Sequence, residues 1–173
     1  TVVVAAVSFF VYRYMAKRGS PAQQEVKKAW KGVVPGQSSV NELYRKAGTP
    51  VSSSQGSSGT TFSYPTKNKY WTSDVSVFQD KVAFVRERIF APAEISLKKR
   101  LEETGKNWTK IYGPDSQYGS FLFAYPALGT AYYADEVHDV VYEIWHFPPT
   151  TIPGLLALPQ AQGFSAVFQP RPD

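Results

Sequence analysis

The sequence repeats one pattern, and this internal repeat limits the possible folds more than any other feature. Residues 34–50 predict a turn, a short capped helix and a helix stop, and residues 96–105 repeat the spacing between the capping Ser and the terminal Gly. The segments that follow repeat as well: Phe62-Ser63-Tyr64-Pro65 returns as Phe123-Ala124-Tyr125-Pro126, and Phe90-Ala91-Pro92 returns as Phe147-Pro148-Pro149. We therefore expect two tandem units of similar architecture, repeat 1 at residues 33–93 and repeat 2 at residues 94–149.

The helix of repeat 1 has the clearest boundaries in the chain. Ser38 or Ser39 is placed to cap its start, and Glu42 completes a capping box with Ser39. Gly48 is placed to end the helix in a left-handed conformation, and Pro50 prevents the helix from continuing. The pattern therefore predicts one short helix at the start of each repeat.

Three strand-like segments follow the helix in each repeat, and they predict antiparallel sheet. The segments are 60–64, 70–78 and 81–90 in repeat 1, and 120–125, 129–134 and 138–147 in repeat 2. Residues 51–61 are rich in Ser and Gly and are expected to form a flexible loop, and residues 106–119 are expected to form a connector. The predicted fold class is α+β, with two tandem helix-plus-antiparallel-sheet repeats preceded by a single transmembrane helix.

The first 18 residues carry the prediction of that transmembrane helix. Residues 1–11 are apolar almost throughout, but an uncharged stretch of this length spans only about 18 Å as a helix, less than the roughly 30 Å of a bilayer core. The chain begins with Thr1, so we expect the helix to be incomplete at its N-terminus. A buried Val-rich strand and the remnant of a signal peptide are the alternatives. The expected membrane-interface residues are Tyr12, Arg13, Tyr14, Lys17 and Arg18.

The positive charge of the chain lies next to this apolar segment. The whole chain has a net charge of +5, and residues 1–31 account for it, since they hold six basic side chains and one acidic side chain. A nucleic-acid-binding protein carries its positive charge on the folded domain, so no nucleic-acid partner is expected. Residues 19–32 instead predict a basic juxtamembrane linker on the lipid bilayer, or alternatively a solvated helix.

The sequence offers few groups for catalysis or metal binding. It has no Cys, which excludes a thiolate nucleophile and Cys-ligated zinc. His138 and His146 lie about 26 Å apart if their strand is unbroken, too far to share a metal ion. Asp135, Glu136 and Asp139 lack the regular spacing of a dedicated calcium loop, so an acidic hairpin tip is the better interpretation. We therefore expect no enzyme activity, no metal, no cofactor and no small-molecule substrate.

A helix, a Gly stop and antiparallel strands, present twice, resemble the beta-lactamase-inhibitor-protein fold, whose relatives include small outer-membrane lipoproteins of barrel assembly. The resemblance rests on Pro35-Gly36-Gln37-Ser38, on Gly48-Thr49-Pro50, on Phe62-x-Tyr64 and on the strand at 82–89. Repeat 2 departs from the pattern, because it has no Pro-Gly-x-Ser turn and no Pro after Gly105. The resemblance implies one curved sheet with its helices on one side, an aromatic partner-binding face opposite, no shared catalytic site and an extracytoplasmic location.

Aromatic side chains on the strands and an apolar, Pro-rich tail at residues 150–173 are the candidate binding surfaces. Alternation along a strand turns about half of the aromatic side chains toward the helices and half outward. Outward-facing Tyr and Trp are common anchors of protein contacts. The predicted partner-binding residues are Tyr70, Trp71, Tyr132, Tyr133, Trp145, Leu155, Leu156, Phe164 and Phe168.

These features together predict a non-enzymatic, single-pass accessory subunit that docks on a larger integral membrane protein complex through its aromatic sheet face and its tail. The alternative is a freestanding membrane-anchored binding module, such as an inhibitor or an envelope-assembly factor. An enzyme with a carboxylate site near Asp135–Asp139 is the third hypothesis. The positive-inside rule places the domain in the cytoplasm, whereas the resemblance favours the extracytoplasmic side, which we adopt as the expectation.

Overall fold

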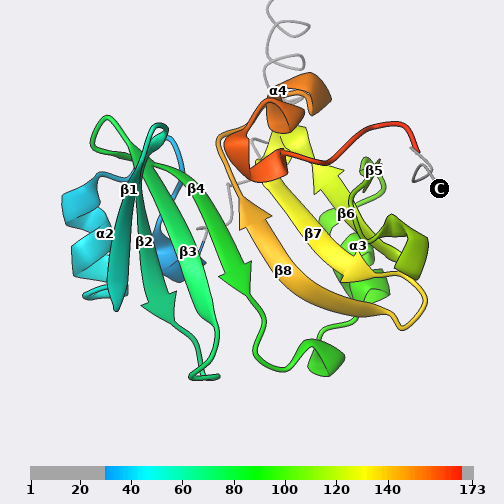
Figure 1. Ribbon diagram of the computed structural model, residues 1–173. Coiled ribbons are helices and arrows are strands. Elements are labelled where there is room, and N and C mark those ends of the chain that lie inside the picture. The colour runs from blue at the N-terminus through cyan, green and yellow to red at the C-terminus, as the bar shows by residue number, and fades with distance from the viewer. Residues whose placement is uncertain (1–29, 169–173) are drawn as a thin grey trace, which may run out of the picture.

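The computed structural model describes residues 30–168, and these form one eight-stranded antiparallel sheet with the strand order β1-β2-β3-β4-β8-β7-β6-β5 (Figure 1). Each half of the chain supplies four consecutive strands, and the two halves meet where β4 pairs with β8. The strands are β1 Ser52–Gly56, β2 Gly59–Pro65, β3 Thr72–Phe78, β4 Lys81–Arg88, β5 Thr109–Tyr112, β6 Ser120–Tyr125, β7 Thr130–Asp135 and β8 Val140–His146.

Within residues 30–168, the helices are few and short. Two α-helices of eight residues precede the strands of the two halves, and a third of five residues follows the last strand. They are α2 Val40–Ala47, α3 Leu97–Thr104 and α4 Ile152–Leu156. Five 3-10 turns complete the elements: η1 Trp30–Gly32, η2 Pro92–Glu94, η3 Ser116–Tyr118, η4 Pro126–Leu128 and η5 Pro159–Ala161.

The ends of α2 confirm the predicted capping box. The Ser39 hydroxyl accepts a hydrogen bond from the Glu42 amide at 3.2 Å, and the Ser39 amide donates to the Glu42 carboxylate at 3.1 Å. Ser38 is not the cap, because its hydroxyl accepts instead from the Val34 amide. Gly48 follows the helix with a φ of 85°, which glycine adopts without strain, but its ψ of −163° lies outside the left-handed conformation that was expected. Local sequence therefore fixes both ends of this helix.

The predicted fold class is wrong, because the sheet dominates the described structure and helices contribute little to it. Two segments that were expected to be irregular are strands. Residues 51–61 contain β1 and the start of β2, which form a hairpin, and residues 106–119 contain β5. Backbone hydrogen bonds to a neighbouring strand stabilise these segments, although Ser and Gly have low strand propensity. Each half therefore has four strands where three were predicted.

The predicted transmembrane helix at residues 1–18 lies outside the described residues, as does most of the predicted linker at 19–32. Of that linker, the structure describes only the η1 turn, in which Trp30 is buried. Within residues 30–168, no helix is long and apolar enough to cross a membrane.

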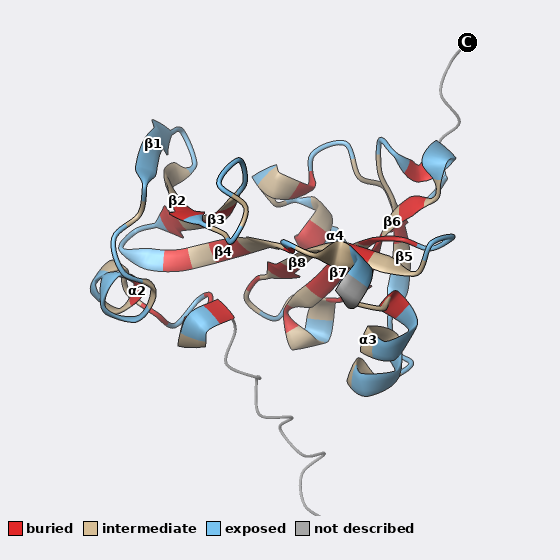
Figure 2. Ribbon diagram, turned by 90° about the horizontal axis from the view of Figure 1, so that it is seen from below, coloured by how far each residue is buried: buried red, intermediate tan, exposed pale blue. Residues whose placement is uncertain are grey.

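The two faces of the sheet carry different elements, as Figure 2 shows with the sheet seen edge-on. The helices α2 and α3 lie against one face, and the C-terminal segment with α4 and η5 lies against the other (Figures 1 and 2). A register shift between Ser76 and Val77 contributes to this division, because it turns Val82 and Val85 toward α2 while Phe84 faces the C-terminal segment. The core is therefore divided among both sides of the sheet.

Three hydrophobic clusters make up this core. The cluster under α2 contains Trp30, Val33, Leu43, Tyr64, Val75, Val77, Val82 and Val85. The cluster under α3 contains Ile89, Leu97, Phe123, Tyr125, Tyr132, Ala134 and Val141. The third, on the opposite face beneath α4, contains Phe84, Ile111, Leu122, Ala124, Ala131, Trp145, Phe147, Leu155 and Ala161.

The second face of the first half of the sheet is not covered in this way. Along β3, the side chains that point toward α2 are buried, and those that point away from it are only half-buried. This alternation is typical of an antiparallel sheet with one solvated face. We call the half-buried set the open face; it consists of Thr61, Ser63, Thr72, Asp74, Ser76, Arg86 and Arg88.

Candidate functional site

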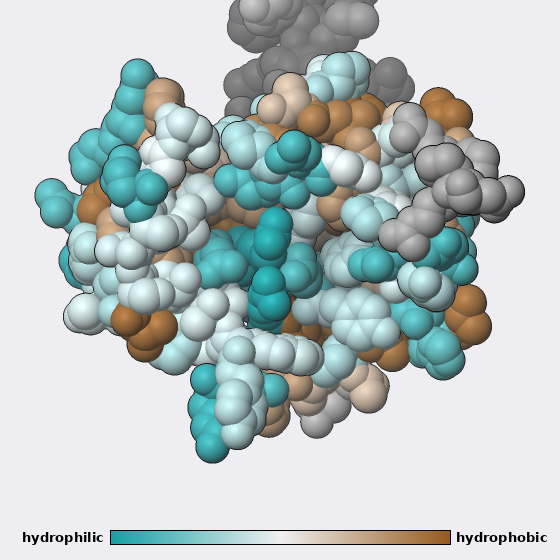
Figure 3. Space-filling model, viewed as in Figure 1, coloured by the Kyte–Doolittle hydropathy of each residue, from teal (hydrophilic) through white to brown (hydrophobic). Residues whose placement is uncertain are grey.

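A group of charged and aromatic side chains lies where the open face meets the second half of the sheet. Arg86 and Arg88 are two residues apart on β4, and Glu143 and Trp145 are two apart on β8, so each pair points to a single face. The β4–β8 register places Arg86 opposite Trp145 and Arg88 opposite Glu143. We call these four residues the arginine cluster. Figure 3 shows hydrophilic side chains gathered in the middle of this face.

Glu143 occupies the centre of the arginine cluster. Its carboxylate lies 3.6 Å from Nε of Arg86 and 3.7 Å from Nε of Arg88, and it accepts a hydrogen bond of 2.8 Å from the indole of Trp145. The guanidinium of Arg86 also lies 5.5 Å from the centre of the Trp145 ring, within the range of a cation–π contact. Glu143 is therefore held by three side chains, two of them from the other half of the sheet.

The charges in the arginine cluster do not cancel. Two guanidiniums face one carboxylate, which leaves one net positive charge, and the Glu143 side chain is only 17% exposed. The other acidic residue of the open face, Asp74, pairs with Arg86 in the β3–β4 register, but its carboxylate accepts hydrogen bonds from Ser63 and Thr72. The described residues form no ion pair between Asp74 and either arginine.

Next to the arginine cluster, Tyr133 is held as a neutral hydrogen-bond donor. It pairs with Glu143 in the β7–β8 register, and its hydroxyl donates to Asp115 at 2.6 Å. Burial raises the pKa of the Tyr133 phenol far above its usual range, and the hydrogen bond to Asp115 raises it further. The phenol therefore adds no charge to this face at physiological pH.

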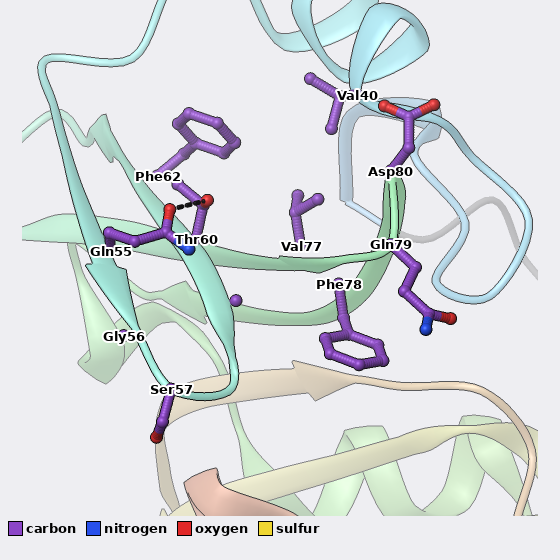
Figure 4. Close-up of a pocket in the computed structure, with 11 residues that line it drawn as sticks. Val40, Gln55, Gly56, Ser57, Thr60, Phe62, Val77, Phe78, Gln79 and Asp80 are labelled. Atoms are coloured by element: carbon purple, nitrogen blue, oxygen red, sulfur yellow. Dashed lines mark hydrogen bonds between the residues drawn. The ribbon is translucent and has the colours of Figure 1, made fainter.

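A groove with a volume of about 530 Å³, drawn in Figure 4, is another candidate site. Val40, Phe62 and Val77 lie on the side of β3 that faces α2, whereas Phe78 points to the other side (Figure 4). The only side-chain hydrogen bond drawn there joins Thr60 to Gln55. The lining residues therefore do not converge on one point, and the arginine cluster is the better candidate site.

The predicted partner-binding residues fall into three groups. Tyr70, Trp71 and Phe168 are exposed; Tyr133, Leu156 and Phe164 are half-buried; and Tyr132, Trp145 and Leu155 are buried. The buried members belong to the core, so the structure gives them no surface for a partner. The predicted membrane-interface residues Tyr12, Arg13, Tyr14, Lys17 and Arg18 lie outside the described residues.

The described part of the C-terminal tail, which was a candidate binding surface, packs on the sheet of its own chain. Leu155 is fully buried, and the ring of Phe164 lies 5.3 Å from that of Trp145. Tyr112 and Ser165 exchange two backbone hydrogen bonds of 2.8 Å. An apolar tail can therefore complete the core of its own domain, which composition alone does not distinguish from an interface.

The histidines and the acidic hairpin have local structural contacts. His138 pairs with Asp135 at 2.8 Å, and His146 lies 3.2 Å from Glu87. Hydrogen bonds, chiefly from the His138 amide, lower the pKa of Asp135. Asp139 accepts hydrogen bonds at the start of α3, and the bond from the Lys98 amide is the main cause of its lowered pKa. Within residues 30–168, no three potential ligands come together to hold a metal ion.

Arg86, Arg88 and Glu143 were not among the predicted site residues. The available signal was the occurrence of charged residues inside strands that are otherwise apolar or aromatic. Glu143 stands between Tyr142 and Ile144, and such a position is costly for a charge unless it has partners. No pattern in the sequence pairs Glu143 with β4.

Comparison of the chain with protein-family models, with curated proteins and with solved structures finds no match. The resemblance to the beta-lactamase-inhibitor-protein fold therefore stays a prediction.

Proposed function

We propose that this protein is a non-enzymatic accessory subunit that binds a protein partner through the open face. The observation that carries the proposal is the uneven covering of the second sheet face. The C-terminal segment covers the half formed by β5–β8, whereas on the half formed by β2–β4 it buries Phe84 and reaches Ser76 through a hydrogen bond from Gln160. The residues of the open face stay half-buried. The open face thus provides a continuous surface on regular strands, a rigid base for recognition.

The composition of this region supports contact with a protein. Arginine and aromatic residues are enriched in protein interfaces, and the open face has the arginine cluster at one side. The loop between β2 and β3 adds Tyr70, which is 79% exposed, and Trp71, which is 42% exposed. Internal hydrogen bonds hold that loop, because Asn68 accepts from the Tyr70 amide and Thr66 donates to the Trp71 carbonyl, so its aromatic side chains are presented at little entropic cost.

The proposed partner is a larger integral membrane protein complex, and the proposed location is the membrane, with the domain on the extracytoplasmic side. These parts of the proposal rest on the sequence of residues 1–18 and on the resemblance. Under the alternative, a freestanding membrane-anchored binding module, the same open face contacts a soluble protein. The accessory-subunit hypothesis and the binding-module hypothesis therefore assign the same binding surface. The identity of the bound protein, a membrane complex or a soluble protein, distinguishes between them.

A photo-crosslinking experiment tests the proposal. A photoreactive amino acid replaces Thr61, which lies on the open face and whose side chain makes no hydrogen bond to the described residues. In native membranes, we expect Thr61 to crosslink to one defined membrane protein. A matched variant places the same group at Lys99, an exposed residue of α3 behind the sheet, and is expected to give no such product. A chain that runs as a free monomer in mild detergent, or equal products from both positions, contradicts the proposal.

A further inference from the structure

Arg86 and Arg88 have hydrogen-bonding capacity that the described residues leave unused. Each guanidinium carries five N–H donors. Nε of both residues is buried and has no hydrogen-bond partner within the described part of the chain. The Glu143 carboxylate is near enough for ion pairing, but 3.6 and 3.7 Å exceed the usual length of such a hydrogen bond. Both ion pairs run through Nε, so the terminal nitrogens are left for another acceptor.

The position of the two side chains is fixed before any partner arrives. Both arise from one strand, and Arg86 is held over the indole of Trp145. Trp145 is itself buried beside Phe84 and Phe164 and hydrogen-bonded to Glu143. Arg86 and Arg88 are 27% and 36% exposed at their side chains, which leaves their ends accessible but partly desolvated. Such an arrangement strengthens electrostatic contact relative to a free surface arginine.

From this geometry we infer that Arg86 and Arg88 form a carboxylate-binding anchor, which receives an Asp or Glu side chain of the protein that docks on the open face. A planar guanidinium matches a carboxylate in shape and donates two parallel hydrogen bonds to it. Arg86, Arg88 and Glu143 together carry one net positive charge, which one carboxylate neutralises. A phosphate group, with nearly two negative charges, exceeds the one positive charge that Glu143 leaves in the arginine cluster. The inference rests on the proposed function and specifies the chemistry of the partner.

The test is an NMR titration of the full chain in mild detergent with a named probe. The probe is a short peptide with one internal Glu and blocked ends, and its twin carries Gln instead. The Nε–Hε resonances of Arg86 and Arg88 are followed, with the Trp145 indole as a third reporter. Arg100 on α3 is the internal control, because it has an exposed ion pair with Glu103.

We expect the Glu peptide to shift the resonances of Arg86 and Arg88 at a roughly tenfold lower concentration than that of Arg100, because Arg86 and Arg88 share the single carboxylate of Glu143, whereas Arg100 is paired with Glu103 alone. The Gln peptide is expected to give no such shift. Glu143→Gln removes the carboxylate that competes with the peptide for the two arginines, so it is expected to tighten binding of the Glu peptide several-fold. Arg88→Gln is expected to weaken binding until Arg86 responds only at the peptide concentration that shifts Arg100. Equal responses of the three arginines, or no effect of Glu143→Gln, overturn the inference.

The outcome is separable from that of the proposed function. If the peptide does not favour the arginine pair but Thr61 still crosslinks to a defined membrane protein, the anchor fails and the docking surface stands. If the peptide binds as expected and no crosslink forms from Thr61, the anchor stands as a carboxylate site and the proposed accessory role fails.

Discussion

Replacing Leu155 by Ala should destabilise the whole domain, because the structure makes this residue part of the core. Leu155 is fully buried in α4, a helix of only five residues. So short a helix has no stability of its own and depends on packing against the sheet. Truncating a fully buried Leu to Ala typically costs about 3 kcal/mol, within a range of roughly 2–5 kcal/mol, through lost burial and the cavity left behind.

The measurement is urea unfolding of the full chain in mild detergent, followed by circular dichroism and by tryptophan fluorescence. A loss of about 3 kcal/mol corresponds to a fall in Tm of roughly 6–12 °C for a domain of this size. Trp145 lies in the same cluster, so its emission should report the loosened packing. The matched control is Leu156→Ala, because Leu156 is chemically identical, adjacent and only half-buried. Its expected cost is about 1 kcal/mol, from partial burial alone.

The two variants together decide between two interpretations of the tail. If Leu155→Ala changes the free energy of unfolding by less than about 0.5 kcal/mol, the size of an ordinary surface substitution, the tail does not complete the core. Equal effects of Leu155→Ala and Leu156→Ala would also refute the reasoning, because the prediction depends on their difference in burial. The first result would restore Leu155 to the surface that faces a partner.

Three further predictions concern the backbone and the acidic hairpin. Asp139→Asn should cost about 1–2 kcal/mol at neutral pH by weakening the cap of α3. The folded-state pKa of Asp139 is lowered, so the carboxylate's contribution to stability is present above the unfolded pKa of about 4 and is lost as the pH falls through the folded-state pKa. Urea midpoints measured from neutral to acid pH should therefore fall less steeply in the Asp139→Asn variant than in the unchanged protein. Ser39→Ala should cost about 1 kcal/mol in thermal or urea unfolding by removing the cap of α2, and the exposed Ser57→Ala should be neutral. Gly59→Ala should cost clearly more than Gly105→Ala in the same assay. Both glycines have a φ near 110°, but of the two only Gly59 would bring a new Cβ against a carbonyl oxygen, that of Val77; equal losses would exclude the clash as the cause.

The sequence predicts those elements whose signals are local. The Ser39–Glu42 capping box is confirmed because all of its donors and acceptors lie within one helical turn. The predicted strand segments 70–78 and 81–90 leave only Gln79-Asp80 between them, and in the structure these two residues form the turn, both with positive φ as in a type I′ hairpin turn. Strand β1 was missed because its residues, Ser-Ser-Ser-Gln-Gly, carry no strand preference, and only pairing with β2 gives it order.

The candidate site depends on information that a single sequence does not contain. Alternation along β8 places Glu143 and Trp145 on the same face, but it does not say which face the C-terminal tail covers. Trp145 was therefore assigned to a partner surface, although it is 2% exposed beneath that tail. The partners of Glu143 lie on β4, in the other half of the chain, and the pairing of β4 with β8 is a property of the whole sheet. The candidate site therefore depends on how β4 pairs with β8, two strands that are far apart in the sequence.

The seam between the two halves is an unusual place for charged side chains. Only four residue pairs join β4 to β8, and they bring charge to both faces: the arginine cluster on one, and Glu87 with His146 on the other. Apolar side chains of similar volume at a buried seam are often at least as stabilising as ion pairs, so stability alone does not account for this choice. The arginines come from the first half, whereas Glu143 and Trp145 come from the second. The cluster therefore exists only where the two halves are joined. Under the proposed function, its partly desolvated donors bind a partner at the seam between β4 and β8.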